Sequence, residues 1–174
     1  RMLRKLSGRG GMAVVEQPPG EVERRLRERW KGLSVAVVNT ASSTVVSGPR
    51  ESVEGLVEEL TREGVFSRRV EVDYASHSEQ VEELLGELKS SLTGVSPQAG
   101  HCQMVSTVTG EAVGSAELDA EYWCRNLREP VRLDRALEQL SEGGHGVYIE
   151  VSAHPVLAMP LTTACGDRGG VVVG

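Results

Sequence analysis

The sequence predicts an α/β protein whose first half has the order strand, helix, strand, strand, helix, strand. Short apolar runs that suit buried strands alternate with longer stretches in which apolar residues recur at helical spacing. A glycine follows each of the two helix-like stretches of this half, where a helix commonly ends. The order βαββαβ is the split arrangement of ferredoxin-like sheets, so we expect such a subdomain over residues 11–73.

Each element of this half follows from its own residue pattern. The first helix carries Val22, Leu26 and Trp30 on one stripe, and the second opens after Gly48-Pro49, because proline suits the first turn of a helix. The predicted strands are Met12–Val15, Leu33–Val38, Thr44–Ser47 and Phe66–Val72, and the predicted helices are Glu21–Lys31 and the stretch from Pro49 to Gly64.

The second half mixes strands and helices in a way typical of the edge of a layered α/β structure. The chain begins within an amphipathic helical pattern at Arg1–Leu6 and ends on the first residues of a strand at Gly169–Gly174. Since domains usually begin and end in exposed polar segments, we expect both ends to be cut. Helices are predicted at Glu79–Ser90, at Val131–Leu140 and from Ala153-His154-Pro155 toward Ala164, and strands at Met104–Thr109 and Val147–Val151.

The composition disfavours several classes of function. A formal charge of −6 argues against a general phosphate-binding surface, and 3% aromatic residues argue against base-stacking platforms, so we expect no nucleic-acid partner. The three cysteines are widely spaced and none lies at zinc-ligand spacing, so we expect no disulfide framework, no metal and a cytoplasmic setting. No apolar run reaches membrane-spanning length, so we expect no membrane partner.

A histidine stands at a predicted strand-to-helix corner, within Asp73-Tyr74-Ala75-Ser76-His77-Ser78. An alternating, strand-like run precedes this segment and an amphipathic helical run follows it. Such a corner fixes the backbone and can aim an imidazole into a cleft, where histidine is suited to act as a general base. A lone histidine at such a corner is more often structural than catalytic, so its neighbours have to decide between the two interpretations.

Four groups of segments resemble those of the acyltransferase domains of modular type I polyketide synthases, in the order of that family. The resemblance covers the whole chain, although the family usually has proline where this chain has Ala153. The matching segments are Gly8–Met12, Asn39 and Val45–Gly48 ahead of Val72–Ser78, Asp119–Val131, and Tyr148–Leu157.

The resemblance implies a ferredoxin-like subdomain (βαββαβ) inserted into the C-terminal part of an α/β-hydrolase-like subdomain. It divides the chain into residues 1–10, the end of a helix of the large subdomain, residues 11–73, the small subdomain, and residues 74–174, the C-terminal part of the large subdomain.

The same resemblance implies a role for each site residue. His77 is implied to be the catalytic base, which takes the proton of a nucleophilic serine and later activates a thiol. Asn126 is implied to fix the His77 tautomer through its backbone carbonyl, and Asn39 to lie near the acyl thioester. No cofactor is expected to be bound. The implied substrate is a coenzyme A thioester, and the implied partners are the phosphopantetheine-bearing acyl carrier protein, the ketosynthase and other domains of the same synthase.

Tyr74, Ala75 and Ser76 indicate the substrate. In this family Tyr-Ala-Ser-His is associated with methylmalonyl units and His-Ala-Phe-His with malonyl units. Serine leaves space that phenylalanine would fill, and one methyl group is worth about 1–3 kcal/mol of discrimination. We therefore expect methylmalonyl-CoA rather than malonyl-CoA. In the alternative interpretation Tyr74 only packs and Ser76 only caps the next helix.

The chain departs from the family at the nucleophile. It contains no Gly-X-Ser-X-Gly elbow, and Gly94-Val95-Ser96-Pro97-Gln98 fails at its last position. Counting back from Gly10-Gly11-Met12, the carboxylate-binding arginine of the family falls just before Arg1. We therefore expect the larger, C-terminal part of an acyltransferase domain, inactive by itself. The alternative is a non-catalytic scaffold or interaction fragment.

Overall fold

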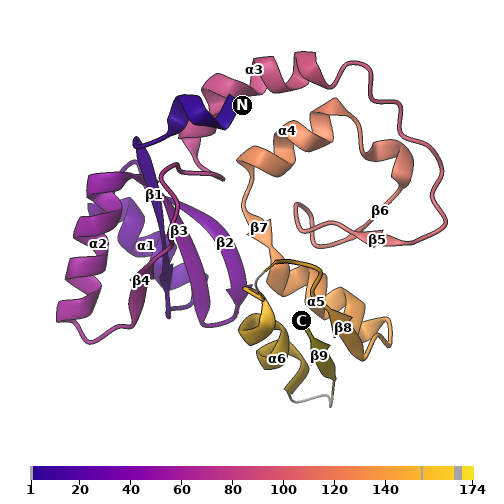
Figure 1. Ribbon diagram of the computed structural model, residues 1–174. Coiled ribbons are helices and arrows are strands. Elements are labelled where there is room, and N and C mark those ends of the chain that lie inside the picture. Colours follow the sequence, from indigo (N-terminus) through magenta and orange to yellow (C-terminus); the bar gives the residue numbers. More distant parts are fainter. Residues whose placement is uncertain (1, 154, 167–169) are drawn as a thin grey trace.

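The computed structural model describes residues 2–153, 155–166 and 170–174. Its central feature is a five-stranded sheet in the order β4-β1-β3-β2-β7 (Figure 1). The first four strands are antiparallel neighbours and form the ferredoxin-like arrangement, so the predicted βαββαβ order is confirmed. The strands are β1 (Gly10–Val15), β2 (Ser34–Thr40), β3 (Ser43–Pro49), β4 (Ser67–Arg69) and β7 (Val131–Arg132).

Two helices, α1 (Pro19–Arg29) and α2 (Arg50–Arg62), pack against one face of this sheet (Figure 1). Because side chains alternate along a strand, β1 sends Ala13 and Val15 to this face and Met12 to the other. The core between helices and sheet is built from small and aliphatic residues, as the low aromatic content predicts. Its buried members are Ala13, Val15, Val22, Leu26, Leu33, Val46, Val53, Leu56 and Leu60.

A charged cluster ties α1 to α2 at the edge of this core. Arg25 donates to Glu59 at 2.6 Å and to the two carboxylate oxygens of Glu63 at 2.9 and 2.7 Å. The hydrogen bonds to Glu63 and Glu59 raise the pKa of the Arg25 guanidinium, so the cation is stabilised where it is largely shielded from water. Glu59 is itself buried, whereas Glu63 is exposed.

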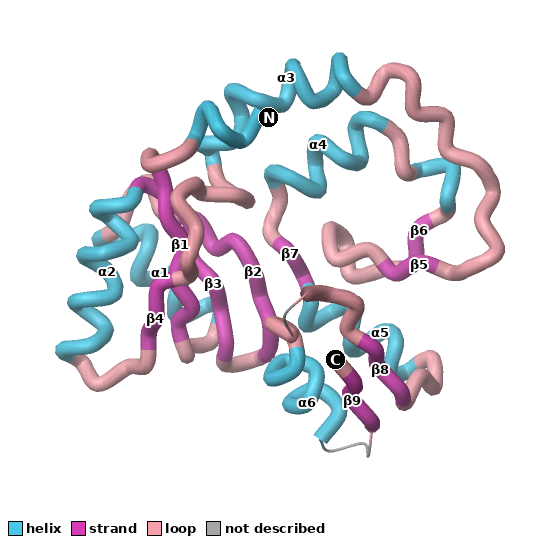
Figure 2. The backbone as a smooth tube through the Cα atoms, in the orientation of Figure 1, coloured by secondary structure: helices cyan, strands magenta, loops and turns pink. Residues whose placement is uncertain are grey.

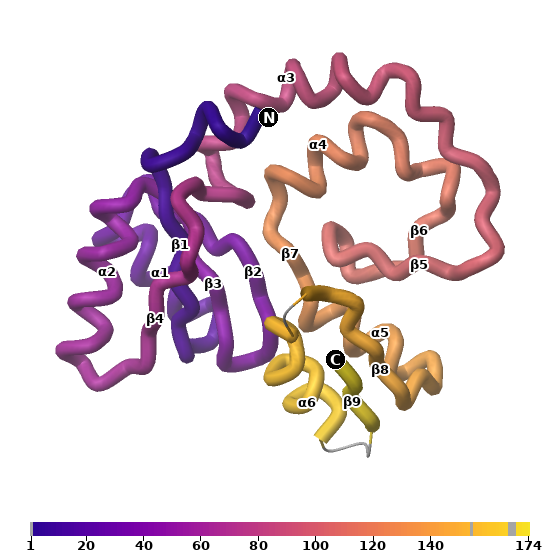
Figure 3. Tube along the Cα trace, viewed as in Figure 1, coloured from indigo at the N-terminus to yellow at the C-terminus, as the bar shows by residue number. Residues whose placement is uncertain are grey.

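Outside the sheet, four helical segments pack together around Leu6, Val81 and Leu84. Figure 3 shows the N-terminal segment, in indigo, beside the start of α3. Arg128 donates to Glu82 at 2.8 Å and so links two of these helices. The segments are η1 (Met2–Leu6), η2 (Glu79–Val81), α3 (Glu82–Ser91) and α4 (Ala120–Arg128).

The remaining elements form two groups, a long excursion that precedes β7 in sequence and a group of helices and strands that follows it. Leu133, Leu137 and Leu161 form the core of the group that follows β7. Figure 2 shows these elements below the long excursion that carries the small β5–β6 pair. The elements after β7 are α5 (Leu133–Glu142), β8 (Val147–Ile149), α6 (Ala158–Gly166) and β9 (Val171–Val173), and those of the excursion are β5 (Met104–Val105), β6 (Ala112–Val113) and η3 (Ser115–Glu117).

Long-range pairing moves one predicted boundary, because the helix expected from Val131 begins only at Leu133. Val131 and Arg132 instead pair in parallel with Val37 and Val38 of β2 as strand β7. This short strand joins the small subdomain to the elements that follow.

Local hydrogen bonds move two other boundaries. The strand expected to reach Val72 ends at Arg69, because Val72 donates to the Val70 carbonyl at 2.8 Å in a tight turn. The last helix begins at Ala158 rather than near Ala153, because the Glu150 carboxylate binds two N–H groups just before it. Arg1, His154 and Gly169, which the sequence places in terminal elements, lie outside the described residues.

The charged cluster yields a stability prediction. Glu59→Gln should lower the free energy of unfolding by about 1.5–3 kcal/mol, because it weakens a charge-assisted hydrogen bond in a largely shielded place. Glu63→Gln is the matched control on the same helix end and should cost less, since water screens its exposed carboxylate. Urea unfolding of the two variants measures the difference. Equal losses would contradict the importance of the buried partner.

Candidate active site

His77 lies on the segment Asp73–Ser78, which runs between the small subdomain and the helices around η2. Its backbone has φ of +57°, and among the described residues no other non-glycine residue has a positive φ. This left-handed conformation is costly for a residue with a Cβ atom and persists only where the surroundings hold it. Such residues cluster at active sites, which favours the catalytic interpretation of the predicted corner.

The imidazole is oriented by a backbone carbonyl. The Nδ1 atom of His77 lies 2.8 Å from the carbonyl oxygen of Glu129. A carbonyl only accepts, so Nδ1 carries the proton and donates it, which leaves the lone pair of Nε2 free to receive one. This is the tautomer that a general base requires.

The acceptor is Glu129, so the expectation that Asn126 supplies this carbonyl is wrong. Asn126 lies inside α4, where carbonyls point along the helix axis. Glu129 follows the last helical residue and has an extended backbone, with ψ of 155°, so its carbonyl can turn away from the axis toward His77. The sequence identified the right segment and the wrong residue within it.

His77 lines a hollow of about 300 Å³ between the two parts of the chain. One wall comes from α1 and the start of β2 in the small subdomain, and the other follows the end of α4. Apolar and charged side chains both contribute, so the hollow suits a ligand that carries both kinds of group. The other lining residues are Glu23, Leu26, Arg27, Leu33, Ser34, Val35, Arg128 and Pro130.

The residues before His77 lie behind it rather than in this hollow. Ala75 is completely buried, and the Ser76 hydroxyl lies 3.3 Å from the sulfur of Met12. Tyr74 packs against the cluster around Leu6 and lines another hollow, next to α2 and β4. Their proposed influence on substrate choice stays a prediction.

The alternative role for Ser76 as a helix cap is wrong. The Ser78 hydroxyl accepts from the N–H of Gln80 at 3.2 Å and so caps η2. Ser78 also donates to the Ala75 carbonyl at 2.9 Å. The Ser76 side chain is therefore not used to start the helix.

Asn39 and His77 line different hollows. Ser34 and Val35, at the start of β2, line the His77 hollow, whereas Asn39 near the end of that strand lines a separate one with α5 and α6. Asn39 lies five residue steps along the extended strand from Ser34, which is a length of roughly 16 Å. Asn39 therefore does not share the hollow of His77, contrary to the expectation that places both in the same site.

Gly10 and Ser47 also contact the segment before His77, although no local sequence pattern predicts a role for either residue. A Cβ atom on Gly10 would lie 2.4 Å from the Ala75 nitrogen, so only glycine allows the segment to pass this close. Ser47 donates to the Ser76 carbonyl at 2.6 Å. Both residues lie within segments that match the family, and a buried serine on a valine-rich strand is the signal that points to a specific hydrogen bond.

Burial lowers the pKa of His77 below its usual 6.5, and the hydrogen bond to the Glu129 carbonyl offsets only part of this effect. The neutral imidazole therefore persists to a lower pH than in an exposed histidine. A base must be unprotonated to accept a proton, so the shift favours the form of His77 that this chemistry requires at neutral pH.

A family model described as an acyl transferase domain matches residues 1–171 of the 174 residues. The chain belongs to this family. The predicted resemblance is thus confirmed over nearly the whole sequence.

The most similar relatives include two large synthases. The chain is 45% identical over 172 residues to the spectinabilin polyketide synthase system protein NorA' of Streptomyces orinoci, and 45% identical over 174 residues to polyketide synthase GfsB of Streptomyces halstedii. These matches cover 98% and 99% of this chain but only 5% and 3% of the relatives.

A solved acyltransferase structure has the same fold. The acyltransferase domain from module 8 of the salinomycin polyketide synthase is 42% identical, with a TM-score of 0.94. The match covers 99% of this chain and 41% of the solved one, so this acyltransferase segment corresponds to less than half of that chain.

Within the part of the chain that the structure describes, no helix combines the length and the apolar character needed to cross a membrane.

The buried imidazole yields a prediction for acid stability. Below pH 6.5 the unfolded chain takes up a proton at His77 that the folded chain resists, so stability falls as the pH falls toward the lowered pKa. His77→Gln keeps a donor for the Glu129 carbonyl and cannot titrate. Between pH 7 and pH 5 the unmodified chain should therefore lose more free energy of unfolding than the variant. Urea unfolding at both pH values tests this, and parallel losses would rule out a lowered pKa.

Proposed function

We propose that this acyltransferase segment supplies the base for transfer of an extender acyl group from coenzyme A to the phosphopantetheine thiol of an acyl carrier protein. One observation carries the proposal. The Nδ1–H group of His77 donates to the Glu129 carbonyl oxygen, 2.8 Å from Nδ1, so Nε2 is left free at a hollow between the two subdomains.

The proposed reaction has two halves that use the same nitrogen. Nε2 takes the proton of a serine hydroxyl as that oxygen attacks the thioester carbonyl, and the proton then goes to the departing sulfur of coenzyme A. In the second half Nε2 takes the proton of the phosphopantetheine thiol, and the sulfur attacks the acyl-serine ester. The serine oxygen recovers the proton as it leaves. A neutral carbonyl, rather than a carboxylate, holds the ring throughout.

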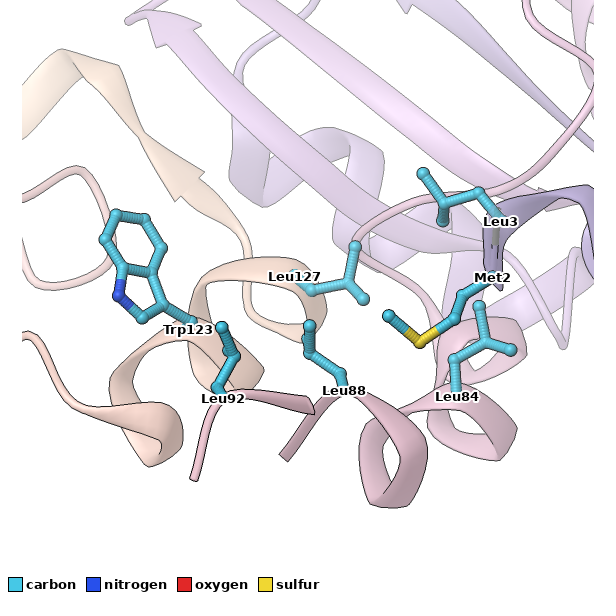
Figure 4. Close-up of a pocket in the computed structure, with 7 residues that line it drawn as sticks. All are labelled: Met2, Leu3, Leu84, Leu88, Leu92, Trp123 and Leu127. Carbon is cyan, nitrogen blue, oxygen red and sulfur yellow. The ribbon is translucent and has the colours of Figure 1, made fainter. Parts of the chain in front are cut away.

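The scheme needs a serine nucleophile, and the 174 residues contain no Gly-X-Ser-X-Gly elbow that would carry one. We therefore propose that the rest of the acyltransferase domain supplies it. An apolar groove of about 400 Å³ favours this view (Figure 4). The groove lies between η1, α3 and α4, and a soluble domain normally covers such a surface. Its lining residues are Met2, Leu3, Leu84, Leu88, Leu92, Trp123 and Leu127.

The β8–β9 pair gives independent support. The two strands are parallel, and Val147, Ile149, Val171 and Val173 are all more than half exposed. Parallel sheets are normally covered on both faces, so this pair suits the edge of a larger layered sheet. The same features would serve a scaffold or interaction fragment, which is the second candidate function.

The polyketide synthase relatives favour an acyl carrier protein, a ketosynthase and other domains of one synthase as partners, and a cytoplasmic setting. Tyr74, Ala75 and Ser76 favour methylmalonyl over malonyl as the extender unit. Arg27 and Arg128 line the hollow, and their guanidinium groups suit the phosphates of coenzyme A or phosphopantetheine, although Arg128 also pairs with Glu82.

The function is tested by changing the base in a complete acyltransferase domain that contains this chain. His77→Ala should reduce acyl transfer by about 10²–10⁴-fold, which is the usual contribution of positioned proton transfer. Circular dichroism verifies the fold of the variant. The 174-residue chain alone should take up no radiolabel from methylmalonyl-CoA, because it lacks the elbow. A folded His77→Ala domain with normal rates would exclude His77 as the base, and stable labelling of the chain alone would contradict an external nucleophile.

Substrate choice is tested with Tyr74→His combined with Ser76→Phe in the same domain. These changes convert Tyr-Ala-Ser-His into His-Ala-Phe-His, the form associated with malonyl units in this family, so preference should shift toward malonyl-CoA. The shift should be partial, because one methyl group contributes about 1–3 kcal/mol. Competition between the two thioesters measures the ratio of their kcat/KM values. An unchanged ratio would show that these two positions do not select the extender unit.

A further inference from the structure

The peptide group that joins Ser76 to His77 is held at both ends. Its carbonyl oxygen accepts a hydrogen bond from the Ser47 hydroxyl at 2.6 Å. Its N–H donates to the Leu127 carbonyl at 3.1 Å. A peptide unit is planar, so bonds at its two opposite ends fix the orientation of the whole plane. That orientation constrains φ of His77, and with it the direction in which the imidazole leaves the backbone.

Ser47 is a rigid anchor for this bond. It is completely buried on β3, the strand that pairs with β1 and β2 on its two sides. Its partners in register are Met12 and Ser34. Both reach the site, since the Met12 sulfur contacts the Ser76 hydroxyl and Ser34 lines the His77 hollow. A hydroxyl on such a strand has little freedom to move away from its acceptor.

We infer that Ser47 is a positioning residue for the base, because its hydroxyl holds the Ser76–His77 peptide and thereby aims the imidazole into the hollow. Ser47 itself does not line the hollow. The inference rests on the function proposed for His77. It explains why a left-handed backbone persists at a histidine, since the peptide on its N-terminal side is bound by both subdomains.

The same strand provides a matched control in Thr44. Like Ser47, Thr44 is completely buried and donates its hydroxyl to a backbone carbonyl, that of Gln17, at 2.9 Å. It lies three residues from Ser47 along β3 and does not line the His77 hollow. Ser47→Ala and Thr44→Val therefore remove equivalent hydrogen bonds, and only the first touches the histidine segment.

Steady-state transfer by a complete acyltransferase domain that contains this chain tests the inference. Ser47→Ala should lower kcat by about 10- to 100-fold with KM for the acyl thioester nearly unchanged, because an ångström-scale displacement of a catalytic group costs on that order. Thr44→Val should keep kcat. Urea unfolding followed by circular dichroism establishes that both variants are folded under the assay conditions.

A second variant guards against a folding defect. Ser47→Cys keeps a short side chain with one heavy atom beyond Cβ but donates only a weak hydrogen bond, so it should also lose kcat. Equal kcat for Ser47→Ala and Thr44→Val, or normal kcat for Ser47→Cys, would overturn the positioning role. His77→Ala is measured alongside. If that variant is active, the proposed function fails. If it is inactive while both Ser47 variants are fully active, only the inference about Ser47 fails.

Discussion

The site depends on the left-handed backbone of His77. A residue with a side chain resists this conformation, so the neighbouring groups must supply more stabilisation than it costs. They do so from several directions. Leu127 and Glu129 bind the histidine itself, Ser47 binds the carbonyl before it, and Gly10 leaves room for the chain to approach the sheet. The direction of the ring is thus a property of the junction between two subdomains rather than of the tetrapeptide alone.

The small subdomain provides the rigid side of this junction. Its sheet is covered by two helices, and the fully buried part of its core consists mainly of valine and leucine, with Trp30 packed against it. Branched side chains have few rotamers and pack closely, so such a core restricts the movement of its strands. This suits a sheet whose opposite face carries Met12 toward the histidine segment, since a displaced strand would displace the contacts of Ser76 as well.

The sequence predicted the features that local patterns encode. The helices and strands of residues 11–73 and the corner at His77 follow from apolar spacing, from glycine and proline positions and from the family motif. The pairing of β7 with β2 joins residues about a hundred positions apart, and no local pattern encodes it. The acceptor for His77 differs from the expected Asn126 for a chemical reason. Every residue offers the same backbone carbonyl, so only the three-dimensional path of the chain after α4 selects Glu129.

The short strand β7 has a mechanical consequence for this junction. Glu129, which holds the ring, is two residues away from Val131, and Val131 is paired with Val37 of β2. The wall of the hollow at Ser34 and Val35 belongs to that same β2. If the two subdomains rotate relative to each other, the Glu129 carbonyl and this wall of β2 move together, because β7 pairs with β2. The direction of the His77 ring relative to that wall is then preserved, and Arg128 and Pro130, which flank Glu129, keep their places at the hollow as well.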